Sequence, residues 1–133
     1  MRFRAGDGDW AVDVAAAREV RTIAALTALP SPEPGVIGLV HRAGEALAVL
    51  STLGTGRDHV LIVEGGDRRF GIVAREVLGL VRIEDAQLGP PPQGQAGRLV
   101  TAVLDLAGAP VLVVDTDVLA GALDGHDVTS AFT

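Results

Sequence analysis

The sequence predicts a single all-β domain, and three observations support this fold class. Short runs rich in Val, Ile and Leu follow one another along the chain and are separated by Gly, Pro or Asp, as in strands joined by tight turns. Two stretches of the sequence resemble each other at a period of roughly 60 residues, which indicates two similar β units. Apolar residues make up 48% of the 133 residues, so the chain can bury a core despite its net charge of −6.

Ten strands are expected from the apolar runs and the turn residues between them. In chain order they are Arg2–Ala5, Asp9–Val14, Glu19–Ala24, Val36–Arg42, Ala46–Leu50, His59–Glu64, Arg69–Ala74, Val77–Ile83, Arg98–Leu106 and Pro110–Asp115. Helical structure is expected to be minor. We predict one turn at Ala15–Arg18 and a short C-terminal helix over Thr116–Leu123, for which Thr116 or Asp115 would be the N-cap.

The turn and connector residues have specific backbone requirements. Asp7-Gly8 and Gly65-Gly66-Asp67 lie between apolar runs, where a hairpin turn needs a positive φ that Gly adopts without steric cost. Pro cannot donate a hydrogen bond to a neighbouring strand and forces the residue before it to be extended. The proline-containing stretches Leu29–Gly35 and Gly89–Gly97 are therefore expected to be connectors.

The internal repeat divides this single domain, residues 1–133, into two halves, which we place at roughly 3–54 and 58–123. Equivalent positions are Trp10 and Phe70, Arg18-Glu19-Val20 and Arg75-Glu76-Val77, and Ala43-Gly44 and Ala107-Gly108. A unit of about 60 residues hides only about 60% of its unfolded surface. We therefore expect a buried apolar seam to hold the two halves together.

The composition excludes several classes of function. With a pI of about 4.9 and no basic stripe, the chain offers no surface for nucleic acid. It has neither Cys nor Lys, which excludes disulfides, thiolate zinc sites, thiol nucleophiles and lysine chemistry. His41, His59 and His126 lack ligand spacing, so no metal or cofactor is expected. No apolar run reaches the roughly 20 residues of a membrane helix, and we expect a cytoplasmic protein that does not insert into the membrane.

Five stretches of the sequence are specific when their order and spacing are taken together. They are "WAVDV" followed by "REV", the proline-rich loop before "GVIGLVHRAGEALAVL", "VLIVEGGDRRFGIVAREVLGLVRI", the "GPPP" connector, and "LVTAVLDLAGAPVLVVDTDVL". In these stretches the chain resembles the CheW family, from Phe3 to about Leu123. The resemblance implies the CheW-like fold, in which two interlocked five-stranded β-barrels share a hydrophobic seam and helices are short and minor.

The resemblance also implies a function. CheW-like proteins are non-enzymatic adaptors that couple the cytoplasmic tips of chemoreceptors to the regulatory domain of a CheA-type histidine kinase, without a cofactor. Glu19 falls at the glutamate of the family's "EV" pair, and Gly38 at the glycine that begins its "GV-x-NLRG" strand. The full set of partner-binding positions that we carry over is Ala17, Glu19, Gly38, His41, Arg42, Ala43 and Gly44.

One position departs from the family pattern. Where the family commonly has Asn-Leu-Arg-Gly, this chain has His41-Arg42-Ala43-Gly44, so Ala43 occupies the place of the receptor-contacting arginine. In a strand, a one-residue offset would turn Arg42 to the opposite face. We therefore expect altered receptor binding, or a partner outside chemotaxis. A second interpretation is that His41 and Arg42 merely flank a hairpin turn at Ala43-Gly44.

An enzymatic alternative rests on the segment Leu112–Val118, "LVVDTDV". It resembles the Asp-Thr-Gly signature of small dimeric aspartic proteases, in which two carboxylates share a proton and activate water. Asp115 would be the catalytic carboxylate, and Asp117 replaces the glycine of that signature. The same segment also fits a helix cap after a strand. Trp10 we interpret as a core or seam aromatic.

Overall fold

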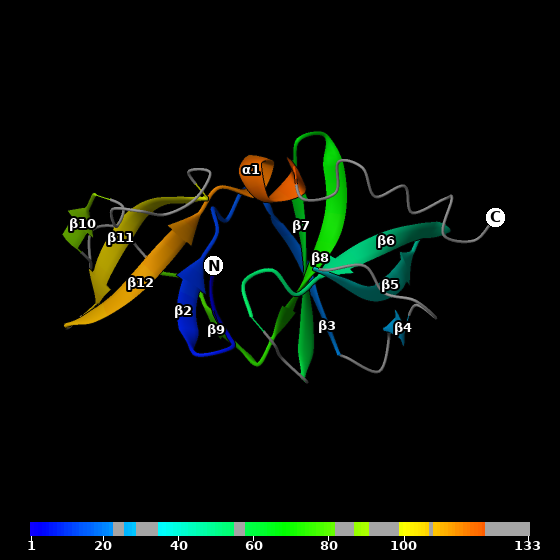
Figure 1. Ribbon diagram of the computed structural model, residues 1–133, viewed down its shortest axis with the longest axis horizontal. Coiled ribbons are helices and arrows are strands. Elements are labelled where there is room, and N and C mark those ends of the chain that lie inside the picture. Colours follow the sequence, from blue (N-terminus) through cyan, green and yellow to red (C-terminus); the bar gives the residue numbers. More distant parts are fainter. Residues whose placement is uncertain are drawn as a thin grey trace.

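The computed structural model describes residues 1–22, 26–28, 35–54, 58–81, 87–90, 99–106 and 108–121. In this part of the chain, twelve strands form two six-stranded sheets, accompanied by one five-residue helix (Figure 1). The elements are β1 (Arg2–Ala5), β2 (Gly8–Ala11), β3 (Ala17–Thr22), β4 (Thr27–Ala28), β5 (Val36–Arg42), β6 (Glu45–Leu50), β7 (His59–Gly65), β8 (Arg68–Ala74), β9 (Glu76–Gly79), β10 (Gln87–Gly89), β11 (Val100–Leu106), β12 (Ala109–Val114) and α1 (Thr116–Ala120). The predicted all-β fold class is confirmed.

The two sheets have the same strand arrangement. Sheet A has the order β10-β11-β12-β2-β1-β9, and sheet B has the order β4-β5-β6-β8-β7-β3. Neighbouring strands are antiparallel except at one place in each sheet, where β12 is parallel to β2 and β6 is parallel to β8. Strands six apart in the chain, such as β1 and β7, therefore occupy equivalent places in the two sheets.

Each sheet combines strands from both parts of the repeat. Sheet A takes the hairpin β1–β2 from the N-terminal part and β9 to β12 from the C-terminal part, whereas sheet B takes β3 to β6 from the N-terminal part and the hairpin β7–β8 from the C-terminal part. In Figure 1, sheet A lies on the left and sheet B on the right. The first hairpin of each part has crossed into the sheet of the other, so the two sheets are interlocked.

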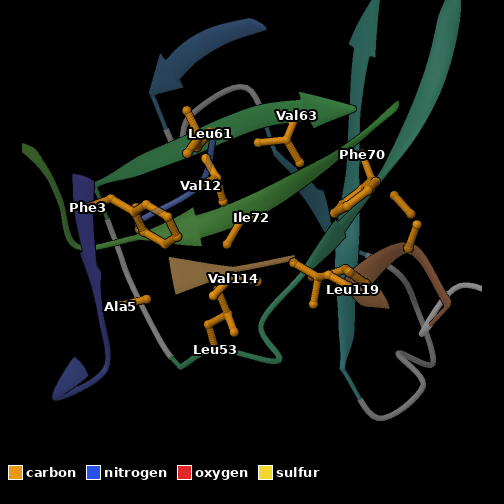
Figure 2. Close-up of a cluster of buried hydrophobic side chains, with 14 of the residues drawn as sticks. Phe3, Ala5, Val12, Leu53, Leu61, Val63, Phe70, Ile72, Val114 and Leu119 are labelled. Carbon is orange, nitrogen blue, oxygen red and sulfur yellow. The ribbon is translucent and has the colours of Figure 1, made fainter. Parts of the chain in front are cut away.

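The largest buried cluster lies between the sheets, and we call it the seam (Figure 2). Phe3 of β1 and Phe70 of β8 are fully buried in it, and Leu119 of α1 packs against the same cluster. The buried members are Phe3, Ala5, Val12, Val36, Leu39, Ala48, Leu50, Leu53, Leu61, Val63, Phe70, Ile72, Ala74, Val114, Leu119 and Ala120. Trp10 is half-buried against the seam, in agreement with its interpretation as a seam aromatic.

Sheet B also buries its second face. Val60 and Ile62 of β7 belong to an inner core, whereas Leu61 and Val63 of the same strand face the seam. Side chains of a strand alternate between its two faces, so burial of both faces requires the continuous apolar run seen in β7. The inner core of sheet B consists of Val40, Leu47, Val49, Val60, Ile62 and Val73, and the smaller inner core of sheet A of Ala11, Leu104 and Val111.

Some predicted boundaries were wrong for physical reasons. β2 ends at Ala11, before the predicted end at Val14, because a turn follows in which Ala16 N–H donates to the Asp13 carbonyl and Ala15 N–H to the Asp13 carboxylate. The turn therefore ends before the predicted Arg18, which lies in β3.

Two short edge strands, β4 and β10, were not predicted. They pair with β5 and β11 and are held by backbone hydrogen bonds that need no apolar run. The predicted strand Val77–Ile83 was too long, because β9 ends at Gly79, whose φ is +97°, and Leu80 and Val81 are not in a strand. Residues 23–24, 82–83 and 98, most of both connectors, Ala107 and the helix residues after Gly121 lie outside the described residues.

Helix α1 fastens the end of sheet A to sheet B. The Asp115 carboxylate accepts hydrogen bonds from the N–H groups of Asp117 and Val118, so Asp115 is the N-cap, one of the two caps predicted. The Asp117 carboxylate accepts a hydrogen bond of 2.7 Å from Gly66 N–H in the β7–β8 turn. Next to it, a Cβ at Gly65 would lie 2.1 Å from the Thr116 carbonyl oxygen, so only glycine allows this approach.

Substitution of Gly65 by Ala is therefore expected to destabilise the protein by about 1–3 kcal/mol, since the clashing atom is backbone and cannot rotate away. Urea denaturation followed by circular dichroism measures this difference. Gly121→Ala is the matched control, because its φ of −60° is helical and an added Cβ meets no atom of the described residues within 4 Å. Equal stability of the two variants would contradict the close contact at Gly65.

Candidate functional site

All seven expected partner-binding residues come from β3 and the β5–β6 hairpin of sheet B. In β3, Ala17, Glu19 and Arg21 are half-buried, and the alternate residues Arg18 and Val20 are exposed. Ala17 pairs with Val63 and packs against the seam. β3 is thus an edge strand whose register shifts after Ala17. Ala17 faces the seam, whereas Glu19 and Arg21 lie on the side of the inner core of sheet B.

Glu19 is the centre of an ion-pair cluster that joins β3 to β5. Its carboxylate accepts hydrogen bonds from Arg21 Nε and, at 2.9 Å, from Arg42 Nε. Arg21 Nη1 also donates to the His41 carbonyl oxygen. We call Glu19, Arg21, Arg42 and the His41 carbonyl the latch. The hydrogen bond from Arg21, and to a smaller extent the one from Arg42, lowers the pKa of Glu19 below its ordinary value. Glu19 is therefore charged at neutral pH.

The latch joins strands that are not neighbours in the sheet. β7, β8 and β6 lie between β3 and β5 in sheet B. The sheet must therefore curl until β3 approaches the end of β5. Glu19 and Arg21 pair in register with Ile62 and Val60, whose side chains belong to the inner core of sheet B. Ion pairs thus close the sheet beside this core, where β3 and β5 form no backbone ladder.

The β5–β6 turn places Ala43 outside the strand. β5 ends at Arg42 and β6 begins at Glu45, and Ala43 and Gly44 have φ values of +50° and +83°. Two central residues with positive φ are typical of a type I′ hairpin turn. Because Ala43 lies in the turn, the alternation of side chains between strand faces does not extend from Arg42 to Ala43. His41 and Arg42 flank the turn, and the Arg42 guanidinium reaches Glu19 directly.

Gly38 has a packing role that its sequence position did not reveal. It is buried in β5, and a Cβ there would lie 2.5 Å from the Thr27 carbonyl oxygen and 2.8 Å from Leu26 Cδ1. A side chain at this position would push β4 away from β5. Gly38 is therefore covered by β4 and separate from the latch.

The structure brings together Glu19, His41, Arg42 and the Ala43-Gly44 turn, while Ala17 faces the seam and Gly38 lies under β4. Arg21 makes two of the latch contacts but was not among the predicted site residues. The signal was present, because Arg21 follows Glu19 by two residues and side chains two apart share a strand face.

The enzymatic alternative depended on Asp115. The structure places this carboxylate at the start of α1, where it accepts backbone N–H groups, and Asp117 likewise holds Gly66 N–H. Among the described residues, no group of three or more His, Cys, Asp or Glu side chains is arranged to hold a metal ion. Within the same residues, α1 is far too short to cross a membrane, and no helix has the required length and apolarity.

Nearly the whole sequence matches one known protein family. The sequence matches the family of the CheW-like domain over residues 1–123. The chain belongs to this family. The chemotaxis protein CheW of Rhizobium meliloti (strain 1021) is 24% identical to this CheW-like domain over 129 residues, which cover 88% of this chain and 83% of that protein.

A solved structure has the same fold. The crystal structure of the scaffolding protein TtCheW from Thermoanaerobacter tengcongensis superimposes with a TM-score of 0.66, covering 86% of each chain at 16% sequence identity. The predicted CheW-like fold is therefore confirmed, with two interlocked mixed sheets as its framework.

Removal of the Arg21 guanidinium tests the latch. In Arg21→Ala the His41 carbonyl loses its donor and Glu19 keeps only Arg42, so amide hydrogen exchange in the hairpin around Ala43 is expected to become faster. The loss in global stability should stay below about 1 kcal/mol, because partly exposed ion pairs contribute little. Hydrogen exchange by NMR measures both effects. Unchanged exchange in the hairpin would show that the latch does not hold it.

A second carboxylate on the same sheet, Glu64, is held by two guanidiniums. Hydrogen bonds from Arg18 and Arg69 lower its pKa to about 2. A carboxylate whose pKa is lower in the folded than in the unfolded protein stabilises the fold at pH values above its unfolded pKa of about 4.3. This stabilisation is lost as the pH falls toward the folded pKa. The melting temperature is therefore expected to fall between about pH 4.5 and 2 by more in the wild type than in Glu64→Gln. An equal fall in melting temperature for the wild type and Glu64→Gln over this pH range would contradict the ion pairing.

Proposed function

We propose that this CheW-like domain is a non-enzymatic adaptor of the cytoplasm that couples a chemoreceptor to the regulatory domain of a CheA-type histidine kinase. The observation that carries the proposal is the family match over residues 1–123. It is supported by the curated relative, a chemotaxis protein CheW, and by the fold shared with a scaffolding protein. An adaptor needs rigid surfaces rather than a reactive centre, and the interlocked sheets provide such surfaces.

The receptor surface in this proposal is the latch end of sheet B. Arg42 replaces the arginine that is absent at Ala43, because the type I′ turn and the pairing with Glu19 hold its guanidinium at the edge of β5. The Arg42 side chain is 28% exposed, so part of the guanidinium remains available to a carboxylate or carbonyl of the receptor. Glu19 acts through Arg42 and fixes the direction in which it points.

Binding assays with two partners test the coupling function. The purified protein is titrated by calorimetry with a CheA regulatory domain and with a receptor signalling fragment from the same genome, and we expect it to bind both. Binding to the kinase domain without the receptor would favour a partner outside chemotaxis. Failure to bind any kinase regulatory domain would refute the adaptor proposal.

The proposed role of Arg42 predicts a selective effect. Arg42→Ala is expected to weaken receptor binding about tenfold, about 1.4 kcal/mol, and to leave kinase binding unchanged. Arg75→Ala is the matched control, because Arg75 is an exposed arginine that directly precedes β9, which is equivalent to β3. Ala43→Arg should restore receptor binding in the Arg42→Ala background. Equal effects of Arg42→Ala and Arg75→Ala would show that the latch end is not the receptor surface.

A further inference from the structure

The β11–β12 hairpin of sheet A occupies the same place as the β5–β6 hairpin of sheet B. Both hairpins are antiparallel, and in both the register shifts after the first residue of the longer strand, Val36 in β5 and Val100 in β11. Val49 of β6 pairs in parallel with β8, and Val113 of β12 pairs in parallel with β2. These correspondences fix which residues of the two hairpins are equivalent.

The hairpin of sheet A is less buried than its counterpart. Four positions that are buried in β5 and β6 are only half-buried in β11 and β12, and they lie on both faces, since Leu39 and Ala48 belong to the seam and Val49 to the inner core of sheet B. Fewer buried apolar contacts mean a smaller free energy holding the hairpin in place. The four pairs are Gly38 and Ala102, Leu39 and Val103, Ala48 and Leu112, and Val49 and Val113.

The tip of the β11–β12 hairpin lacks the ion pair that holds the tip of β5–β6. The last residue of β5 is Arg42, whose guanidinium reaches Glu19 on β3 as part of the latch. The last residue of β11, at the equivalent position, is Leu106. An apolar side chain at this position cannot bind a carboxylate on the strand that would close the sheet.

The strand that corresponds to β3 offers no substitute for the latch. The repeat makes Glu76 on β9 the equivalent of Glu19, but Glu76 Oε2 lies 3.2 Å from Arg4 Nη1 on the neighbouring strand β1. The charged residues of β9 and β11 are Glu76 and Asp105, which are both acidic, so these two strands cannot form an ion pair with each other. Sheet A is therefore not closed by a latch.

The inner core beneath the β11–β12 hairpin is small. Leu106 and Val113 are only partly buried against it, and Leu88 of β10, which pairs with β11, is 60% exposed. Movement of the hairpin tip therefore uncovers less apolar surface in sheet A than it would in sheet B. Among the described residues, the inner core of sheet B has six buried members, whereas that of sheet A has three, Ala11, Leu104 and Val111.

The opposite end of the hairpin is firmly anchored. Val100 and Val114, at the end that leads to α1, are buried, and Val114 belongs to the seam. The register shift after Val100 marks a place where the strand bends. At the turn end, Ala109 and Pro110 are exposed, and Figure 1 shows this end of β12 at the outer left edge of the molecule. The hairpin thus has a fixed base and an unlatched tip.

We propose that β10, β11 and β12 form a mobile arm, which bends at the register shift after Val100 so that its tip opens away from β9 and closes toward it. The latched hairpin β5–β6 stays closed. The seam is unaffected by this motion, because the base of the arm remains buried in it. Sheet A is thus the adaptable half of the molecule and sheet B the fixed half. The motion belongs to the chain alone and does not depend on the proposed adaptor function.

Amide hydrogen exchange of the full chain, measured by NMR without a partner, tests the motion. After correction for intrinsic rates, the amides of β11 and β12 are expected to exchange at least about tenfold faster than those of β5 and β6. The β1–β2 hairpin is the control within sheet A and should exchange more slowly than the arm. Equal exchange in the two equivalent hairpins would overturn the proposal. Exchange of β1–β2 as fast as that of the arm would also overturn it, since sheet A would then open as a whole.

A latch built into sheet A tests the cause of the motion. Leu106→Arg places a guanidinium at the position equivalent to Arg42, and exchange in β11 and β12 is expected to slow by about threefold. Leu106→Gln is the matched control, because its side chain is polar but uncharged, and it should give no slowing. The slowing should also be lost in Leu106→Arg combined with Glu76→Gln, and in about 0.5 M NaCl, which screens exposed charges.

Equal exchange in Leu106→Arg and Leu106→Gln would show that the missing ion pair does not free the arm, and would overturn the proposal. Melting curves verify that each variant is folded. If Leu106→Arg does not fold, the comparison of the two hairpins in the wild type still decides.

Discussion

The fold depends on one constraint, which is that the hairpins β1–β2 and β7–β8 are built into the sheet of the opposite half. Each hairpin sends one face into the seam, where Phe3 and Phe70 are fully buried. Both phenylalanines share this cluster with apolar residues of the opposite sheet. The seam is therefore the product of the exchange, and each sheet loses two of its inner strands if the hairpin built into it leaves.

Sheet B completes its inner core by a different kind of contact. Its apolar inner face is covered by backbone-paired strands on most sides, but β3 and β5 meet only through the latch. The same three charged side chains hold the Ala43-Gly44 turn in place and present Arg42 beside it. The latch thus both closes sheet B and shapes the proposed receptor surface, so a change in Glu19 or Arg21 affects both.

The alternation of apolar and turn residues was sufficient to predict the long strands, such as β5, β7 and β8, because their burial on one or two faces dictates their composition. The repeat predicted two similar units with a seam. It did not predict that each sheet contains strands from both parts, because the local sequence does not specify which distant strands pair. β4 and β10 escaped prediction because they are only two and three residues long. Glu19 and Arg42 were both among the predicted partner-binding residues, whereas their contact depends on the curl of sheet B and was not predicted.

The order of strands in the chain also has a consequence for synthesis. The strands of sheet B, β3 to β8, are contiguous in sequence from Ala17 to Ala74, although they come from both parts of the repeat. Sheet A begins at Arg2 but is complete only when β12, residues Ala109–Val114, has been made. On a ribosome that synthesises the chain from its N-terminus, all strands of sheet B are available first. The β1–β2 hairpin, with Phe3 and Trp10, is therefore the oldest part of the nascent chain and among the last to find all its neighbours.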